Sequence, residues 1–146
     1  MNTVYLDTNI FVYSNDSASP FFLKCNKFVE YSLKTNIDLA TSTETIQEIV
    51  HLAKKSKNLG LGLKTADIVL RLTQLLLPVD KETIFVYLDL LQKHKNIKQV
   101  ESRDFIHISA CVRYDIKIFV TYDKDFKQFK EIQSLTPEEF LNKFKS

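Results

Sequence analysis

Hydrophobic residues along the chain follow two different spacings, and each spacing predicts a type of element. Short apolar runs bounded by polar segments predict buried strands, whereas apolar residues at intervals of three and four predict helices. The predicted strands are 3–6, 37–41, 76–79 and 116–121, and the predicted helices begin directly after Asp7 and cover about 21–34, 42–56, 64–75, 81–94 and 103–114, with a short helix after Thr136.

Residues with helix-capping chemistry stand at the start of most of these helices. Thr41 and Glu44 have the spacing of a capping box, in which each side chain bonds the other residue's backbone N–H. Gly60 and Gly62 are the only glycines in the chain, and the segment that holds them is predicted to end the helix from 42. The other start signals are Ser19 followed by Pro20, Asp80, Ser102, and a second capping box formed by Thr136 and Glu139 around Pro137.

The order of the elements predicts an α/β fold with a central parallel sheet flanked by helices. Short strands that alternate with helices form parallel sheets covered on both faces. The helix at 81–94 is expected to pack on the sheet through Ile84, Leu88 and Leu91. A length of 146 residues matches one ordinary domain, so a single domain over 1–146 is expected.

Composition narrows the class of protein further. The chain is 45% hydrophobic and 26% charged, as globular proteins are, and its net charge of +2 is too small to indicate a nucleic-acid binder by itself. Cys25 and Cys111 lie in apolar helical patterns and are expected to be small core residues rather than zinc ligands. No signal peptide or membrane-spanning stretch is evident, so a cytoplasmic protein is expected.

Two predicted strands end on acidic residues. Asp7 follows the strand at 3–6, and Asp123 and Asp125 follow the strand at 116–121. Because ligands of parallel sheets bind outside the carboxyl ends of the strands, these acids are expected to meet at one edge. Each also has a structural interpretation, since Asp7 is a suitable helix N-cap and the other two are common turn residues.

Two further acids lie beside apolar helical stripes. Asp104 is one turn before Ile108, at the start of the helix from 103, where the helix dipole also favours a negative charge. Glu48 flanks the stripe formed by Ile46 and Ile49, and a solvated flank is its structural alternative. Together with Asp7, these positions suggest a cluster of carboxylates.

Clustered carboxylates repel one another, and a divalent cation removes the conflict. Mg²⁺ prefers oxygen ligands and needs only one or two direct carboxylates, and acid clusters without histidine suit Mg²⁺ or Mn²⁺ better than zinc. The expected metal ligands and catalytic residues are Asp7, Glu48, Asp104 and Asp123. Such a site would assist an in-line displacement at phosphorus.

Four segments of the chain resemble the signature segments of the PIN domain family. They are "YLDTNIFVY", "STETIQEIVHL", "RDFIHISACVRYDI" and "FVTYDKDF", and the chain length with "TPEEF" near the end resembles single-domain VapC-type toxins. The resemblance implies a metal-dependent endoribonuclease with a five-stranded parallel sheet and an acidic pocket. It places the family's four acids on Asp7, Glu48, Asp104 and Asp123, and its supporting residues on Asn9 and Thr121, with Asp125 as an alternative fourth acid.

The resemblance also implies an RNA substrate, a small VapB-like antitoxin as partner, and a homodimer. Lysines near the acids would steer an RNA backbone, although a solvated surface explains them equally well. His107 is expected to be a buried histidine with satisfied hydrogen bonds, with a phosphate contact as the alternative. The lysines are Lys54, Lys55 and Lys57 in one group and Lys124, Lys127 and Lys130 in the other.

Two other classes of function remain open from the residues. One is a phosphoryl-accepting α/β protein, such as a receiver domain or a haloacid dehalogenase-like phosphatase. The phosphatase pattern requires a second Asp two residues after the first, where this chain has Asn9, and the acid pair of a receiver is not evident. The other is a PIN-like module that binds RNA or a protein without catalysis and needs no metal.

Overall fold

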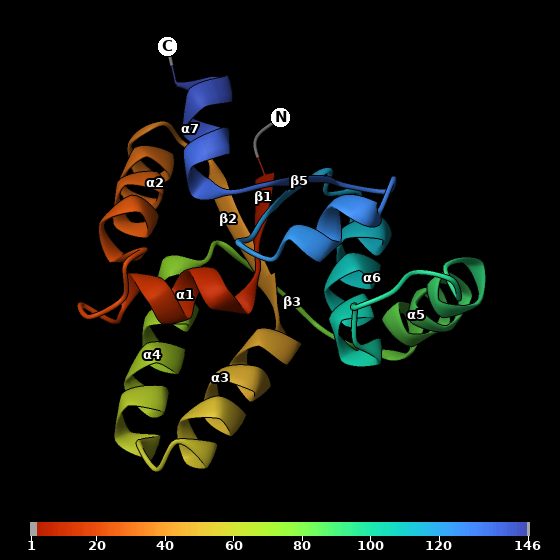
Figure 1. Cartoon of the computed structure of the whole chain (residues 1–146), viewed down its shortest axis with the longest axis horizontal. Helices are drawn as coiled ribbons and strands as arrows, with labels where there is room; N and C mark the ends of the chain where they lie inside the picture. Colours follow the sequence, from red (N-terminus) through yellow and green to blue (C-terminus); the bar gives the residue numbers. More distant parts are fainter. Residues whose placement is uncertain (1–2, 146) are drawn as a thin grey trace.

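The computed structural model describes residues 3–145 and contains one parallel five-stranded sheet (Figure 1). The strand order is β3-β2-β1-β4-β5, so the direction of strand progression reverses beside the central strand β1. All four pairings are parallel, as the alternation of strands and helices predicts. The strands are β1 (Thr3–Leu6), β2 (Asp38–Ser42), β3 (Leu75–Leu77), β4 (Ile118–Val120) and β5 (Gln133–Leu135).

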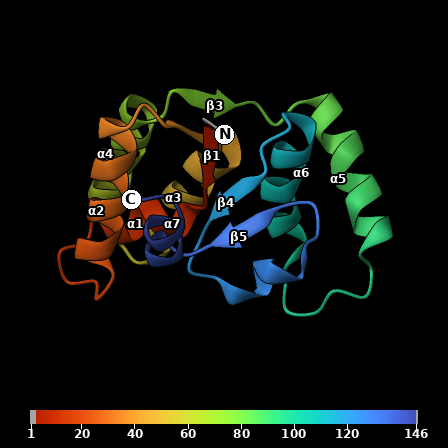
Figure 2. The same ribbon diagram turned by 90° about the horizontal axis from the view of Figure 1, so that it is seen from above.

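Seven α-helices within residues 3–145 cover the two faces of this sheet, which confirms the predicted α/β class (Figures 1 and 2). Helices α5 and α6 pack together on one side, and the remaining helices lie on the other side. The helices are α1 (Thr8–Ser14), α2 (Phe22–Lys34), α3 (Thr43–Lys55), α4 (Leu59–Leu72), α5 (Lys81–Lys93), α6 (Phe105–Arg113) and α7 (Pro137–Phe144), with two short 3₁₀ segments at Ser102–Asp104 and Lys124–Gln128.

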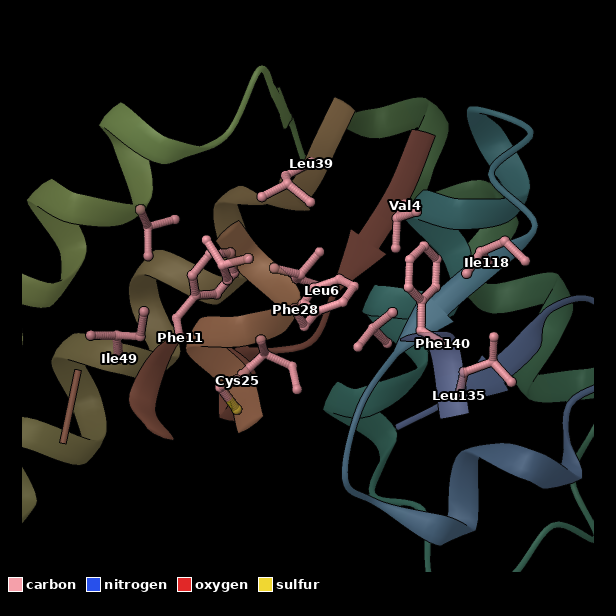
Figure 3. Packing of buried hydrophobic residues seen from close by; sticks show 14 of the residues in the cluster. Val4, Leu6, Phe11, Cys25, Phe28, Leu39, Ile49, Ile118, Leu135 and Phe140 are labelled. Atoms are coloured by element: carbon pink, nitrogen blue, oxygen red, sulfur yellow. The ribbon is translucent and has the colours of Figure 1, made fainter. Parts of the chain in front are cut away.

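Successive residues of each strand point to opposite faces, so the sheet separates two hydrophobic cores. In β1, Val4 and Leu6 belong to the first core, and Tyr5 belongs to the second. Figure 3 shows the first core, where Phe28 of α2 and Phe140 of α7 pack beside the strand residues. Cys25 and Cys111 are buried free thiols, which confirms that they are core residues.

Several predicted helix boundaries are confirmed by their caps. Asp7 caps α1 by accepting from the Thr8 N–H, and Asp80 caps α5 by accepting from the Thr83 N–H. Thr136 and Glu139 form the predicted capping box at the start of α7. These short polar side chains satisfy backbone donors that the helix itself cannot pair.

Two predicted caps are wrong because the helices begin later. Ser19 is not the N-cap of α2, which begins at Phe22, although its side chain accepts from the Phe21 N–H. Ser102 does not cap α6, because a 3₁₀ turn intervenes and the helix begins at Phe105.

The capping box predicted between Thr41 and Glu44 is also wrong. Strand β2 continues to Ser42, which makes Ser42 the N-cap of α3 and puts Glu44 one position too early. The Thr41 hydroxyl bonds the Leu6 carbonyl and the Thr45 hydroxyl instead. Glu44 is buried and forms an ion pair with Arg103, just before α6.

The glycines do not separate helices as predicted, because both lie inside α4, which begins at Leu59 and ends at Leu72. Gly62 faces α3, where a β-carbon on it would lie 2.2 Å from the Ala53 Cβ. Gly60 has open space around the same position. Close packing of α4 against α3 therefore accounts for one glycine only.

The predicted helix at 64–75 is also wrong at its last residue, Leu75. It begins β3, whose bounds are Leu75–Leu77 rather than 76–79, and it is not part of the preceding helix.

The stripe predicted for α5 is wrong at Ile84 and Leu88, which are exposed, and is confirmed at Leu91, which packs against the second core. The helix also packs through Thr83 and Leu90, which are buried. Strand β5 is absent from the predicted strand ranges because "QSL" is too short to show alternation. No helix within residues 3–145 combines the length and hydropathy needed to span a bilayer.

Replacing Gly62 with alanine should destabilise the protein, because the added methyl group would overlap Ala53 across the α3–α4 contact. We expect a loss of about 1–3 kcal/mol in the free energy of unfolding. The matched change Gly60→Ala should instead be neutral or stabilise by up to about 1 kcal/mol, since alanine is the better helix former. Urea denaturation measures both values, and equal effects of the two variants would contradict this helix contact.

A candidate acidic active site

The candidate site lies at the carboxyl edge of the sheet, where the strand order reverses between β1 and β4. Asp7 follows β1 directly, and its N–H donates to the Val120 carbonyl over 3.0 Å, which continues the β1–β4 pairing by one residue. Thr121 and Asp123 follow β4 at the same edge, and Glu48 projects from α3, which follows β2. The parallel topology therefore brings residues distant in the sequence together.

Asp7 is buried, with 7% of its surface exposed, and each carboxylate oxygen accepts hydrogen bonds. Oδ1 accepts from the Thr8 N–H over 2.8 Å, and Oδ2 accepts from the Thr121 hydroxyl over 2.7 Å and the Asn9 amide over 3.4 Å. Thr121 Oγ1 also accepts from the Asn9 amide and the Asp123 N–H. A single hydroxyl thus connects Asp7, Asn9 and the Asp123 backbone.

Glu48 is partly buried and is held by two donors. One carboxylate oxygen, Oε1, accepts from the Thr8 hydroxyl over 2.9 Å and contacts His107 Nε2. Within residues 3–145, the second oxygen, Oε2, has no hydrogen-bond partner. The side chain is therefore fixed from one side, and its solvated-flank interpretation is wrong.

His107 is fully buried and links Glu48 to the second core. Its Nδ1 lies 2.6 Å from the Tyr5 hydroxyl, which in turn donates to Ser42 Oγ over 2.9 Å. This arrangement satisfies both ring nitrogens when the imidazole is protonated and donates from each. The prediction of a buried, satisfied histidine is confirmed.

The four acids expected at the site line one pocket of about 250 Å³. Asp104, at the end of the 3₁₀ turn before α6, and Asp123, at the start of the next 3₁₀ segment, complete the set with Asp7 and Glu48. Asn9, Thr8, Val12, Tyr13, Leu52 and Phe126 form the remaining wall. The lining of the pocket is thus partly acidic and partly apolar.

Asp125 and Glu44 lie outside this set of lining residues. The Asp125 N–H donates to Asp123 Oδ1 over 2.9 Å, so Asp125 supports the turn through its backbone. Glu44 is occupied by Arg103. Lys127 pairs with Glu139, whereas Lys124 is exposed beside the acids.

Burial and mutual repulsion alter the proton affinities of these acids. Burial raises the pKa of Asp7, although the charge of His107 and the bond from Thr121 oppose the increase. Burial, together with the charge of Asp7, raises the pKa of Asp104 to about 6. For Glu48, burial acts in the same direction, but the hydrogen bond and charge of His107 outweigh it and lower the pKa.

His107 shows the complementary effect. Burial by itself would lower its pKa, but the surrounding oxygens of Tyr5, Glu48 and Asp7 raise the pKa well above its ordinary value. A protonated His107 beside an ionised Glu48 is therefore the favoured state at neutral pH.

The donor set fits a hard divalent cation. All four acids supply carboxylate oxygens, and His107 is already engaged by Glu48, which favours Mg²⁺ or Mn²⁺ over zinc. Within the described part of the chain, no three acidic, histidine or cysteine side chains are close enough to form a ready-made cation cage. Mg²⁺ tolerates such an open site, because it keeps several waters and needs few direct carboxylates.

Three residues that hold Glu48, His107 and Glu44 in place were not predicted from the sequence. Thr8 bonds Glu48, Tyr5 bonds His107, and Arg103 pairs with Glu44. From the sequence, Thr8 could be interpreted only as a turn residue and Tyr5 only as an apolar strand residue. The one signal for Tyr5 was its position in the strand, which points its side chain to the opposite face from Val4 and Leu6.

The fold and pocket define the class as an α/β protein with four carboxylates at the switch point of a parallel sheet. A profile of the PIN domain matches residues 4–132. The chain therefore belongs to the PIN domain family, which confirms the resemblance noted from its sequence segments.

Two similar proteins come from Mycobacterium tuberculosis. Ribonuclease VapC13 is 24% identical over 132 residues, which cover 90% of this chain and 98% of the relative. Ribonuclease VapC23 is 26% identical over 120 residues, which cover 82% of this chain and 92% of the relative. Both similarities thus extend over nearly the whole length of each protein.

Solved structures share the fold at lower identity. The DNA-bound VapBC structure from Salmonella typhimurium has a TM-score of 0.72 at 16% identity, covering 94% of this chain and 99% of that chain. VapBC2 from Rickettsia felis, bound to a promoter DNA fragment, has a TM-score of 0.71 at 20% identity, covering 92% and 98%. VapC20 from Mycobacterium tuberculosis, described as a sarcin-ricin loop cleaving toxin, has a TM-score of 0.69 at 15% identity, covering 89% and 98%.

Asp104→Asn should remove a pH-dependent part of the stability measured without divalent cations. The folded protein binds the Asp104 proton more tightly than the unfolded chain, since the pKa rises from 3.8 to about 6. This contribution is fully present below the lower value and is lost as the pH rises through the higher one. In wild type, the loss of this contribution lowers the free energy of unfolding as the pH rises through that interval. The Asp104→Asn variant has no such loss, so it should gain stability relative to wild type over the same interval.

Urea denaturation at a series of pH values, with chelator present, measures this difference. Asp125→Asn is the matched control, because it removes a carboxylate from the same edge of the sheet but outside the pocket. The control should keep the Asp104-dependent slope. Parallel stability curves for wild type and Asp104→Asn over this interval would contradict the burial and repulsion described for Asp104.

Proposed function

We propose that this protein is a metal-dependent endoribonuclease that cleaves phosphodiester bonds of RNA and acts as the toxin of a VapBC-type toxin–antitoxin pair. The observation that carries the proposal is the pocket lined by Asp7, Glu48, Asp104 and Asp123 in a member of the PIN domain family. Similarity to ribonucleases VapC13 and VapC23 supports RNA as the substrate. Mg²⁺ is the proposed cofactor, with Mn²⁺ as a substitute.

Some pocket residues would face the substrate, and others hold those residues in place. Thr121, Asn9 and the Thr8 N–H fix the carboxylate of Asp7, and His107 fixes Glu48. Asp104 and Asp123 also line the pocket, and each comes from a different 3₁₀ segment. When bound by these acids, Mg²⁺ would supply electrostatic stabilisation of the charge that develops on the phosphate group.

One carboxylate of the pocket is proposed to orient the attacking water and accept its proton. Asp104 suits this role, because burial and the charge of Asp7 raise its pKa to about 6, close to neutral pH. Glu48 suits it less well, since His107 lowers its pKa. Side chains already fixed by hydrogen bonds lower the reorganisation needed during the reaction.

A VapB-like antitoxin is the proposed partner, and the VapBC complexes with the same fold support this assignment. An apolar pocket of about 140 Å³ lies between α1, α3 and α4 and shares Val12 and Leu52 with the acidic pocket. A segment seated there would reach the acids. We also propose a homodimer and a cytoplasmic location, both of which follow from the toxin assignment.

The other functions considered from the sequence have less support. Membership of the PIN domain family favours a nuclease over a receiver or a phosphatase. A non-catalytic RNA-binding module would keep the fold but would not need four acids around one pocket. The cleavage assays below distinguish that alternative directly.

Purified protein should cleave single-stranded RNA in Mg²⁺ or Mn²⁺ and lose that activity in EDTA. Mg²⁺ should also raise the melting temperature, because a ligand of the folded state stabilises it by mass action, by about 2.7 kcal/mol at 100 times its Kd. Asp7→Asn and Asp104→Asn should raise the melting temperature without metal and reduce the response to Mg²⁺. Equal cleavage with and without EDTA would overturn the metal-dependent mechanism.

Single amide substitutions should separate the pocket acids from their neighbours. Asp7→Asn, Asp123→Asn and Glu48→Gln should each lower the cleavage rate by about 100-fold or more while leaving the fold intact, because each removes charge needed in the transition state. Asp125→Asn and Glu44→Gln are the matched controls and should retain near wild-type rates. Glu44→Gln should lower stability, since it removes the partner of Arg103.

Initial cleavage rates and thermal unfolding, measured on the same preparations, test these assignments. Loss of cleavage in Asp125→Asn with activity retained in Asp123→Asn would reverse the assignment of the fourth acid. The same reversal at Glu44 and Glu48 would overturn the assignment on α3.

A further inference from the structure

Three aromatic side chains lie beside the acidic pocket and have no part in the proposed chemistry. Tyr13 comes from α1, Phe21 precedes α2, and Tyr122 follows β4. The ring centroids of Phe21 and Tyr122 are 4.2 Å apart, and Tyr13 lies 5.1 Å from Phe21 and 5.8 Å from Tyr122. We call these three residues the aromatic patch. All three are partly exposed.

The aromatic patch connects the acidic pocket to a second pocket of about 330 Å³. Tyr13 lines the acidic pocket, and Phe21 and Tyr122 line the second one. Asp123 belongs to both, so it forms their shared wall. A chain of nucleotides with one phosphate at the acids would therefore place a neighbouring nucleotide at the aromatic patch.

Tyr122 is held in place before any ligand arrives. Its hydroxyl donates to the Glu138 carboxylate at the start of α7, and its N–H donates to Asn9 Oδ1 over 3.4 Å. The inner sides of the rings pack against the first core, which accounts for their burial on that side. A fixed ring that is still partly exposed loses little conformational entropy when a planar ligand stacks on it.

The charges around the second pocket decide which part of a nucleotide it would take. Lys124 and Lys127 line it, together with three acids, Asp123, Glu138 and Glu139. Lys127 is already paired with Glu139. Because carboxylates outnumber lysines, a phosphate group is disfavoured there, whereas an uncharged base is not.

We propose that the aromatic patch is a base-stacking subsite for single-stranded RNA, which takes the base of a nucleotide adjoining the cleaved phosphate. This inference rests on the proposed nuclease function and adds a substrate contact to it. Aromatic side chains commonly bind unpaired bases in this way, and the stacking is tolerant of sequence because every base has a π-face. The subsite would therefore favour unpaired over paired RNA.

A fluorescent oligonucleotide tests the contact without cleavage. The probe is a short single-stranded RNA that carries 2-aminopurine, bound to the Asp7→Asn protein. Stacking should quench the probe, and Tyr122→Leu or Phe21→Leu added to this protein should reduce the quenching and raise the Kd about tenfold. Leucine keeps an apolar side chain but removes the aromatic face. A thermal unfolding transition for each variant shows that it is folded.

Two controls separate stacking from other effects. Phe85 is an exposed aromatic residue on α5, with 56% of its surface accessible, and it lines neither pocket, so Phe85→Leu removes a comparable ring elsewhere. It should leave the Kd unchanged. Tyr122→Phe keeps the ring and loses the hydroxyl that contacts Glu138, so it should retain most of the binding. A loss in Tyr122→Phe as large as in Tyr122→Leu would overturn the stacking role.

Cleavage kinetics separate this inference from the proposed function. In the otherwise wild-type enzyme with Mg²⁺, Tyr122→Leu and Phe21→Leu should raise KM about tenfold and change kcat much less. If wild type cleaves RNA but these variants match Phe85→Leu, the subsite is overturned and the nuclease stands. If wild type binds through the aromatic patch without cleaving, the nuclease is overturned and the binding surface stands. If it does neither, both fail.

Discussion

The burial of one carboxylate at the end of the central strand constrains most of this structure. Only 7% of Asp7 is exposed, so its charge depends largely on donors that the protein places around it. Those donors come from the next residue, from Asn9 in the following helix, and from Thr121 beyond β4. The pairing of β1 with β4 is therefore both a sheet contact and the condition for a stable Asp7.

A second set of hydrogen bonds connects the two sides of the sheet. Ser42, Tyr5 and His107 connect the second core to Glu48 on the pocket side. Buried polar groups of this kind are costly when left unpaired, so the connection holds α3, β1 and α6 in one relative position. The same connection explains why Glu48 and Asp104 differ in proton affinity, since His107 contacts only the first of them directly.

The strand ends were predictable from the sequence because an acid that follows a short apolar run is a local signal. Asp7 and Asp123 were expected to meet on this basis, and they do line one pocket. Most helices were likewise evident from their spacing. The α4 boundary was not, because only the packed partner Ala53 shows why Gly62 lies within a helix.

Other features depend on tertiary contacts that no local pattern encodes. Glu44 had the spacing of a capping residue, but β2 continues to Ser42, so Glu44 is not in the capping position and pairs with Arg103 instead. The stripe of α5 was only partly right, because Ile84 and Leu88 keep the same period as Leu91 but are exposed, whereas Leu91 packs against the second core. The roles of Thr8 and Tyr5 appear only once α3 and α6 are in place.

The spread of the pocket acids along the chain has a consequence for synthesis. Asp7 is made first, but its partner Thr121 and the last pocket acid, Asp123, follow only after α6 and β4. No amino-terminal fragment that ends before β4 holds the complete set of carboxylates. An emerging chain therefore leaves the ribosome with the pocket unassembled for most of its translation.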